Sequence, residues 1–195
     1  FYKLVNQGLI LGSDGQKMSK SRGNVVNPDD ILVEFGSDAF RLYEMFMGPL
    51  EMVKPWNTKG VEGVYRFLGR VWRMFIDEQS EQEFEQQLTV DPDRGPELLA
   101  ALKLNDAVGQ AEATQGQLKV LHTCIKKVTE DMEYLRFNTA ISAMMVFTNE
   151  ASNWEIRPLS VMNDFLLLLA PFAPHIAEEL YAKANGGDST IAYQP

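Results

Sequence analysis

Apolar residues recur at intervals of three and four through most of this 195-residue sequence. The clearest run begins after Asn57 or Thr58, either of which can cap a helix, and reaches about Asp77. Its apolar positions are Val61, Val64, Tyr65, Leu68, Val71, Trp72 and Phe75. Because an α-helix repeats every 3.6 residues, these side chains share one face. We therefore expect one long helix here, packed by this face against the rest of the chain.

Further helical patterns follow the acidic middle of the sequence. They cover approximately residues 98–104, 117–135, 138–153, 158–170 and 174–184. Gly, Pro and Asn separate them, and none alternates apolar with polar residues as a strand would. The stretch from Glu78 to Pro96 is rich in Glu, Gln and Asp with little periodicity, which is typical of a solvated linker or a variable insertion. The sequence thus predicts a mainly α protein whose larger part is an antiparallel helix bundle.

The first 55 residues contain shorter elements. Residues 9–11 read as a strand that enters a turn containing two glycines. Residues 27–30, Asn-Pro-Asp-Asp, are a strong helix start, with an Asn cap, Pro at the first helical position and two carboxylates near the positive helix end. This helix should stop at Gly36, and Ser37 with Asp38 should cap the next one.

Composition and charge exclude several classes of protein. The single Cys124 excludes an internal disulfide and suits a reducing interior, and no apolar run approaches the ~20 residues needed to span a bilayer. The net charge of −9 argues against binding nucleic acid by bulk attraction, although residues 1–75 hold 10 Lys/Arg and 8 Asp/Glu whereas residues 76–195 hold 8 and 19. His122 and His175 are too few and too scattered for a metal site, and we interpret them as helix-cap or packing residues.

A cluster of cations and hydroxyls lies between the strand and the first helix. Residues 17–24 read Lys-Met-Ser-Lys-Ser-Arg-Gly-Asn. Three cations and two hydroxyls within six residues, beside glycines that let backbone N–H groups come close, suit a mobile clamp for a polyphosphate. Such a clamp can stabilise negative charge on a departing pyrophosphate without an acid or a base. For a bare motif of this kind, a solvated loop or a kinase substrate is the alternative interpretation.

Residues 17–21 resemble, letter for letter, the KMSKS signature of class I aminoacyl-tRNA synthetases, and residues 23–28 continue with the Gly-Asn-Val-Val-x-Pro tail of those enzymes. The signature is shared with the valine and isoleucine enzymes, which remain an alternative. Residues 36–42 resemble a segment of the large editing subgroup of this class. Residues 48–49, 56–57, 60–68, 136–141 and 169–180 more closely resemble the leucyl-tRNA synthetases of bacterial and organellar type. The resemblance covers nearly the whole chain and is weakest across residues 80–116.

This resemblance implies two domains and a set of roles. Residues 1–55 would be the end of a class I catalytic domain, and residues 56–195 a helical, anticodon-binding-type domain that docks on tRNA(Leu). The parent enzyme would activate leucine with ATP, accompanied by Mg²⁺, and transfer it to the tRNA. Lys20 and Lys17 would be the catalytic residues at the ATP phosphates, with Met18, Ser19 and Ser21 completing the ATP-binding set. Residues 23 and 24 would shape the return of the loop to the helix.

The sequence contains no HIGH-type tetrapeptide, no Gly-rich first βα turn and no editing segment. We therefore expect an incomplete piece of the enzyme that is inactive alone, binds no cofactor tightly, and reaches ATP and leucine only through the absent part of the catalytic domain. The family further implies a monomer in the cytoplasm. An organellar compartment is the alternative. The sequence starts at Phe1 without an initiator Met, so a targeting segment of the parent protein would lie outside it.

A second face of the long helix is basic. Arg66, Arg70 and Arg73 recur at four and three residues and are candidates for contacts with the tRNA backbone. The alternative is a solvated face with an intrahelical pair between Glu62 and Arg66. A competing function for the whole chain is a non-catalytic helical module that binds structured RNA or protein.

Overall fold

A computed structural model describes residues 2–187 and 189–194 of the chain. The helices in these residues are α1 (Pro28–Phe35), α2 (Ser37–Phe46), α3 (Thr58–Phe75), α4 (Glu78–Val90), α5 (Gly95–Ala101), α6 (Gln115–Glu133), α7 (Phe137–Ala151), α8 (Leu159–Leu169) and α9 (Pro174–Asn185). Two-residue strands form two parallel pairs, β1 (Ile10–Leu11) with β2 (Lys54–Pro55), and β3 (Val108–Gly109) with β4 (Arg157–Pro158). The predicted mainly α fold is confirmed. Within the described residues, every helix is too short or too polar to cross a membrane.

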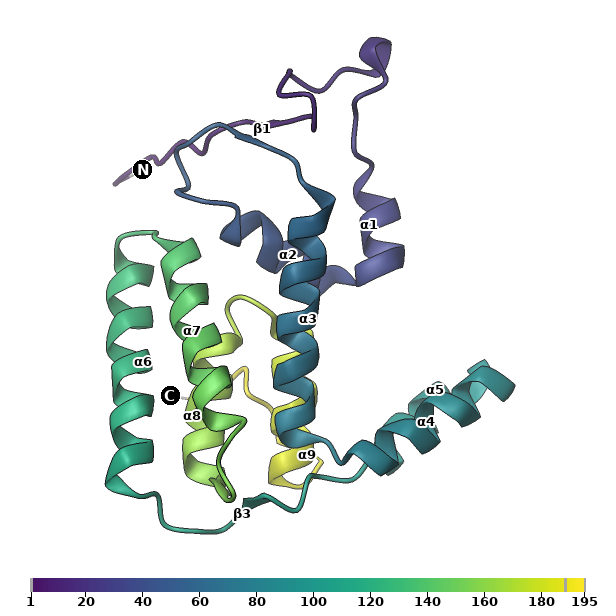
Figure 1. Ribbon diagram of the computed structural model, residues 1–195, viewed down its shortest axis with the longest axis vertical. Coiled ribbons are helices and arrows are strands. Elements are labelled where there is room, and N and C mark those ends of the chain that lie inside the picture. Colours follow the sequence, from purple (N-terminus) through teal and green to yellow (C-terminus); the bar gives the residue numbers. More distant parts are fainter. Residues whose placement is uncertain (1, 188, 195) are drawn as a thin grey trace.

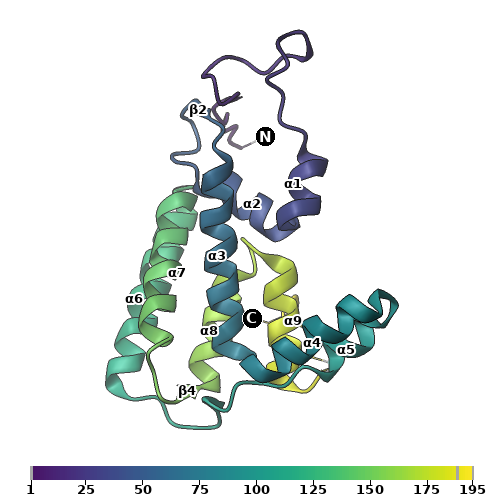
Figure 2. The same ribbon diagram turned by 45° about the vertical axis from the view of Figure 1, so that its right-hand side comes forward.

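The bundle consists of α3 and α6 to α9, and α6 to α9 run alternately up and down (Figure 1). The chain between β1 and α1 lies at one end of the bundle, and α4 with α5 projects sideways from the opposite end (Figures 1 and 2). Asn57 caps α3 as expected, because its side-chain oxygen accepts a hydrogen bond from the Lys59 N–H at 3.1 Å.

One continuous hydrophobic core extends from Ile31 and Leu42 in the first helices to Leu180 in α9. Its largest fully buried side chains include Phe67, Phe75, Phe147, Phe165 and Phe172. Burial of each such side chain contributes roughly 1.5–3 kcal/mol to folding. Because this core runs across residue 55, the two parts of the chain fold against each other.

The buried surface of α3 is broader than the one face expected from the sequence. Phe67 and Met74 are buried in addition to the predicted positions, whereas Tyr65 is 51% exposed and meets Phe35 edge to face, with ring centroids 5.8 Å apart. The reason is that α3 packs against α2, α7 and α9 at once. A helix with neighbours on several sides buries residues outside a single apolar stripe.

The expectation of a solvated linker after Glu78 is wrong, because α4 occupies most of this stretch, and the alternative of a variable insertion stays a prediction. The Asp77 side chain caps this helix by accepting a hydrogen bond from the Ser80 N–H at 2.8 Å, and Gln79 bonds to Glu83 one turn later. Most of α4 is exposed, and Phe84 is its apolar contact with the core. A helix with so small a buried face shows no periodicity in its sequence.

The expected cap of α2 by Ser37 and Asp38 is also wrong. The N-cap position of α2 is Gly36, at φ +82°, and no side chain caps this end. Asp38 lies in the first turn of α2 and instead accepts hydrogen bonds from the N–H groups of His175 (3.4 Å) and Ile176 (2.7 Å) at the start of α9. Its carboxylate is thus committed to a helix far along the chain. His175 lies in the first turn of α9 and its N–H is a donor, so the cap at this helix end is Asp38 and not His175, against the interpretation of His175 as a helix-cap residue.

The turn between α6 and α7 is fixed by a fully buried carboxylate. Asp131 accepts hydrogen bonds from Lys127 (2.8 Å), Arg136 (2.7 Å) and Thr139 (2.6 Å). Burial alone would raise the pKa of Asp131, but these bonds outweigh it and hold the pKa below its ordinary value. Leu135, at φ +55°, lets the chain reverse inside this network.

A buried arginine serves the ends of two helices. Arg157 donates to the carbonyls of Ala151 (3.1 Å) and Ser152 (3.1 Å) at the end of α7 and of Met74 (3.2 Å) near the end of α3. These carbonyls belong to the last helical turns, where intrahelical partners are lacking and the helix dipole favours a cation. Burial lowers the pKa of Arg157.

Replacing Arg157 by Met should destabilise the folded chain by about 3 kcal/mol, because buried carbonyls lose their donors. The free energy of unfolding in urea, followed by circular dichroism, measures this. Arg94→Met is the matched control, since Arg94 pairs with Glu97 on the exposed surface and should matter little. Equal stability of the Arg157 and Arg94 variants would contradict the role given to Arg157.

Candidate functional site

The segment between β1 and α1 that contains Lys17 and Lys20, here called the cationic loop, is attached to a small parallel sheet. In β1 and β2, Ile10 pairs with Lys54 and Leu11 with Pro55, and the N–H of Trp56 donates to Leu11 O at 2.9 Å. Trp56 is buried in the core, so the base of the loop is fixed to the body of the protein.

The first turn of the loop depends on glycine. The Gly12 N–H donates to Gln16 O at 2.8 Å, and Gly15 takes φ +74°. A Cβ on Gly12 would lie 2.7 Å from Asp14 Oδ1 and 2.9 Å from Asn24 Nδ2, so a larger residue would displace these two side chains. The turn therefore brings residue 14 against residue 24.

Asn24 closes the loop by contacts with three residues. Its Oδ1 accepts from the Ser19 N–H at 2.9 Å, and its Nδ2 donates to both carboxylate oxygens of Asp14 at 3.1 Å and to Lys17 O at 3.4 Å. Hydrogen bonds from the Gln16 N–H and from Asn24 lower the pKa of Asp14. Both ends of the loop are thus held by one amide and one carboxylate.

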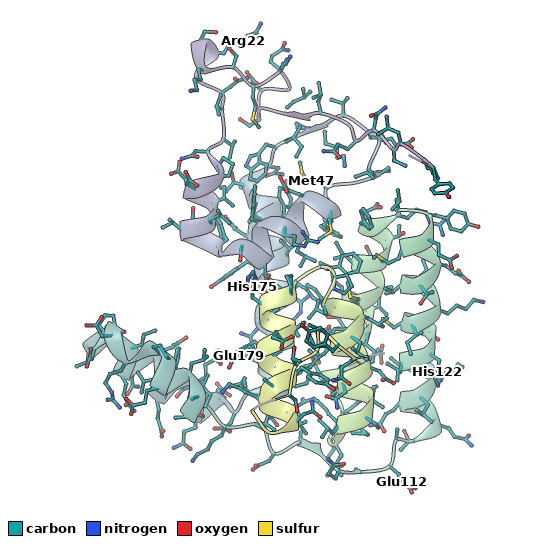
Figure 3. All side chains as sticks on the ribbon, turned by 180° about the vertical axis from the view of Figure 1, so that it is seen from behind. Arg22, Met47, Glu112, His122, His175 and Glu179 are labelled. Carbon is teal, nitrogen blue, oxygen red and sulfur yellow. The ribbon has the colours of Figure 1, made fainter. Side chains whose placement is uncertain are left out.

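The outer part of the loop presents its cations to solvent. Residues Lys20–Arg22 form a single 3₁₀ turn, which ends when the Gly23 N–H, at φ +67°, donates to Lys20 O at 3.2 Å. The hydroxyls of Ser19 and Ser21 are 2.7 Å apart. Lys17, Lys20 and Arg22 are all exposed, and Arg22 lies at the outer tip of the molecule (Figure 3). No ion pair among residues 2–187 and 189–194 engages either lysine, so their charge remains available to a bound anion.

Met18 packs against the core, unlike the two exposed lysines. It is half-buried against the core and lines a cavity of about 160 Å³ with Ile10, Val26, Pro28, Phe40, Glu44 and Trp56. The apolar side chain therefore anchors the middle of the loop, while its neighbours in the sequence stay exposed.

The three arginines of α3 do not form one uniform exposed row. Arg66 is exposed, whereas Arg70 is half-buried and its Nε has no hydrogen-bond partner in the described structure. Arg73 lines a groove of about 500 Å³ together with Trp72 and the α4 residues Glu81 and Glu85. Within the described ranges, the ion pairs include none between Glu62 and Arg66. Arg70 and Arg73 belong to the second half of α3, which ends beside α4 at the end of the bundle opposite the loop (Figure 1).

Among the described residues, no group of three His, Cys, Asp or Glu side chains could hold a metal ion. Cys124 is buried, and burial raises the pKa of its thiol to about 12, so it stays protonated at neutral pH.

The two ends of the chain match two known families. Residues 1–52 match the family described as "tRNA synthetases class I (I, L, M and V)", and residues 115–195 match the "Anticodon-binding domain of tRNA ligase". Leucine–tRNA ligase of Leptospira biflexa is 49% identical over 195 residues, which cover 100% of this chain and 20% of that protein. Leucine–tRNA ligase of Prosthecochloris aestuarii is 50% identical over 100% of this chain and 21% of its own length. The chain belongs to the leucyl-tRNA synthetases.

A solved leucyl-tRNA synthetase has the same fold over this region. The agnB2 LeuRS of Agrobacterium radiobacter K84, in a ternary complex with tRNA and LeuAMS, superimposes with a TM-score of 0.72 and 31% identity. The match covers 97% of this chain and 23% of that synthetase. The chain thus spans about a fifth of the length of its relatives. The resemblance to class I synthetases inferred from the KMSKS sequence and its tail is confirmed. The closer resemblance to the leucyl-tRNA synthetases, inferred from residues such as 60–68, 136–141 and 169–180, is confirmed as well.

One residue that shapes the cationic loop was not predicted from the sequence. Asn24 was assigned to the return of the loop, but Asp14, the carboxylate that Asn24 holds, was overlooked. The available signal was an Asp-Gly turn at residues 14–15 ahead of an Asn that follows a glycine, since Asp favours such turns and its oxygens accept local hydrogen bonds.

Replacing Asn24 by Ala should loosen the loop, because Ser19 N–H, Asp14 and Lys17 O lose their common partner. Trypsin cleaves after Lys and Arg, so limited proteolysis at residues 17, 20 and 22 measures the change; we expect cleavage to accelerate by on the order of tenfold, the equivalent of a lost net hydrogen bond. Asn27→Ala, which removes the nearby cap of α1, is the control. Unchanged cleavage in the Asn24 variant would contradict the closure.

Asn24→Asp adds a pH readout to the same experiment. It places two carboxylates side by side and should loosen the loop at neutral pH, with the effect relieved as the pH falls below about 4 and one carboxylate takes up a proton.

Proposed function

We propose that this chain supplies the ATP phosphate clamp and the tRNA-docking helices of a leucine–tRNA ligase. The observation that carries the proposal is the exposed pair Lys17 and Lys20, which form no ion pair with the residues that the structure describes, on a loop whose base is fixed to the core. In the parent reaction, leucine and ATP form leucyl-adenylate, and the leucyl group then passes to the terminal ribose of tRNA(Leu).

The two lysines act by electrostatics. A carboxylate oxygen of leucine bonds to the α-phosphorus of ATP while the bond from that phosphorus to the α,β-bridging oxygen breaks. Negative charge then grows on the departing pyrophosphate, and the ammonium groups of Lys20 and Lys17 stabilise it. Ser19 and Ser21 offer hydroxyl donors beside them, and Met18 holds the loop from below. Mg²⁺ arrives with the ATP phosphates as part of the substrate.

We assign the two roles to the two parts of the chain expected from the sequence: residues 1–55 act as the end of the catalytic domain, and residues 56–195 dock on the tRNA body. The family matches over residues 1–52 and 115–195 support this assignment. Exposed Arg66 and Arg73 are the candidates for its phosphates, with Arg70 contributing its partly buried charge. The segment that binds the other side of ATP lies outside this sequence, so the chain alone is expected to be inactive. We place the reaction in the cytoplasm, in a monomeric enzyme.

Lys20→Ala, made in a full-length synthetase that contains this chain, should slow leucine-dependent pyrophosphate exchange by on the order of 10²-fold, as expected for the loss of a charge contact in the transition state. Lys126→Ala is the control, because Lys126 is a highly exposed lysine on α6. An exchange rate equal to that of the control would remove Lys20 from the mechanism.

The competing module hypothesis makes a different prediction for the chain by itself. Docking on phosphates predicts that the affinity of the isolated chain for tRNA falls steeply with salt, and that Arg66→Ala with Arg73→Ala reduces the slope of log K against log salt by about two. Arg94→Ala, which removes an ion-paired surface arginine, should leave the slope unchanged.

Filter binding at several salt concentrations measures both. Flat, negligible binding would show that recognition depends on other domains. Tight binding together with no pyrophosphate exchange by the full-length protein would favour the non-catalytic module.

A further inference from the structure

The start of α9 has no cap of its own. Its N-cap residue Ala173 has no side chain that could accept a hydrogen bond, and Pro174 at the first position has no N–H. The next two N–H groups, of His175 and Ile176, have no intrahelical acceptor because they lie in the first turn. Both donate to Asp38, which is 137 and 138 residues away in the sequence.

Asp38 is well placed to be more than a local cap. It is 9% exposed, and its Oδ1 also lies 2.8 Å from His175 Nδ1. It sits in the first turn of α2 as well, so one carboxylate faces the positive ends of two helices. His175 lies at the end of α9 that meets α2 (Figure 3). Arg41, one turn further along α2, donates to Pro171 O at 3.0 Å and adds a second bond between α2 and the segment that leads into α9.

Helix α2 is the common support of the loop and the bundle. It follows α1 after the single residue Gly36, and α1 begins four residues after Asn24. Its other side is held to the start of α3, because the Asn57 N–H donates to Tyr43 Oη at 3.2 Å. By contrast, the internal bonds of the loop, through Asn24, Asp14 and the β1–β2 pair, do not involve Asp38.

We propose that Asp38 is a positioning residue that fixes the KMSKS loop relative to the tRNA-docking bundle, so that the bound nucleotide and the docked tRNA meet in register for leucyl transfer. This inference rests on the proposed function. Activation of leucine uses the loop but needs no tRNA, whereas transfer needs both parts in a fixed relation. A displacement of ~1 Å in such a relation can cost on the order of 10²-fold in rate.

The test uses three variants of a full-length synthetase that contains this chain: Asp38→Ala, Asp38→Asn and Asp77→Ala. Asp77→Ala is the matched control, because Asp77 caps α4 at the other end of the molecule by the same kind of bond. Pyrophosphate exchange reports activation, and the kcat and KM of tRNA charging report transfer.

Asp38→Ala should lower kcat/KM for tRNA charging at least about tenfold while pyrophosphate exchange stays within about threefold. Asp38→Asn should show a smaller loss, a severalfold rise in the KM for tRNA, since its amide oxygen can still accept from the Ile176 N–H. Asp77→Ala should leave both reactions within about threefold.

A purely structural role would give a different result. Equal losses in both reactions for Asp38→Ala, the same pattern for Asp77→Ala, or no loss in either reaction would overturn the inference. Thermal unfolding, followed by circular dichroism, shows whether each variant folds. If Asp38→Ala does not fold, Asp38→Asn replaces it in the test. We then expect a severalfold rise in the KM for tRNA, and an unchanged KM would overturn the inference. Failure of the proposed function is distinct, because the wild-type enzyme would then show no leucine-dependent exchange.

Discussion

Helix ends leave backbone groups without intrahelical partners, and the way this bundle satisfies two of these ends holds its segments together. Asp38 of α2 accepts hydrogen bonds from N–H groups in the first turn of α9, and Arg157 of β4 donates hydrogen bonds to carbonyls at the ends of α7 and α3. Both side chains are buried, and each carries the charge that the helix dipole favours at its end. Because each joins segments distant in sequence, the hydrophobic core between them is confined to one arrangement.

The cationic loop combines a rigid frame with free charge. Gly12, Asp14 and Asn24 define its path, Met18 anchors its middle, and the ammonium groups of Lys17 and Lys20 remain in solvent. A clamp for a triphosphate needs this combination. Lysines engaged in ion pairs would have to break them before binding, and an unanchored loop would lose more conformational entropy on closing over its ligand.

Much of this fold could be predicted from the sequence because its helices bury one apolar stripe between clear caps. The long helix α3 starts at Asn57 as expected, and α6 to α9 lie within a few residues of their predicted ranges. The helix α4 was missed because its contacts with the core are too few to impose a period. The partner of Asp38 was missed for another reason: an Asp near a helix start reads as a local cap, and the sequence does not show that the receiving N–H groups lie 137 residues away. The cationic loop was recognised from its sequence motif. Its closure through Asp14 was not predicted, because it depends on the geometry of a turn that the sequence specifies only weakly.

The arm formed by α4 and α5 changes how the acidity of the chain should be weighed. Residues 77–101 hold eight Asp/Glu and one Lys/Arg, so they carry −7 of the net −9. This arm projects sideways from the end of the bundle that lies farthest from the loop (Figure 2). Surface fields decay within about 10 Å at moderate ionic strength. The rest of the protein is therefore close to neutral where a polyanion would approach it. The arm repels a polyanion from one side only and so steers it toward the other sides of the protein.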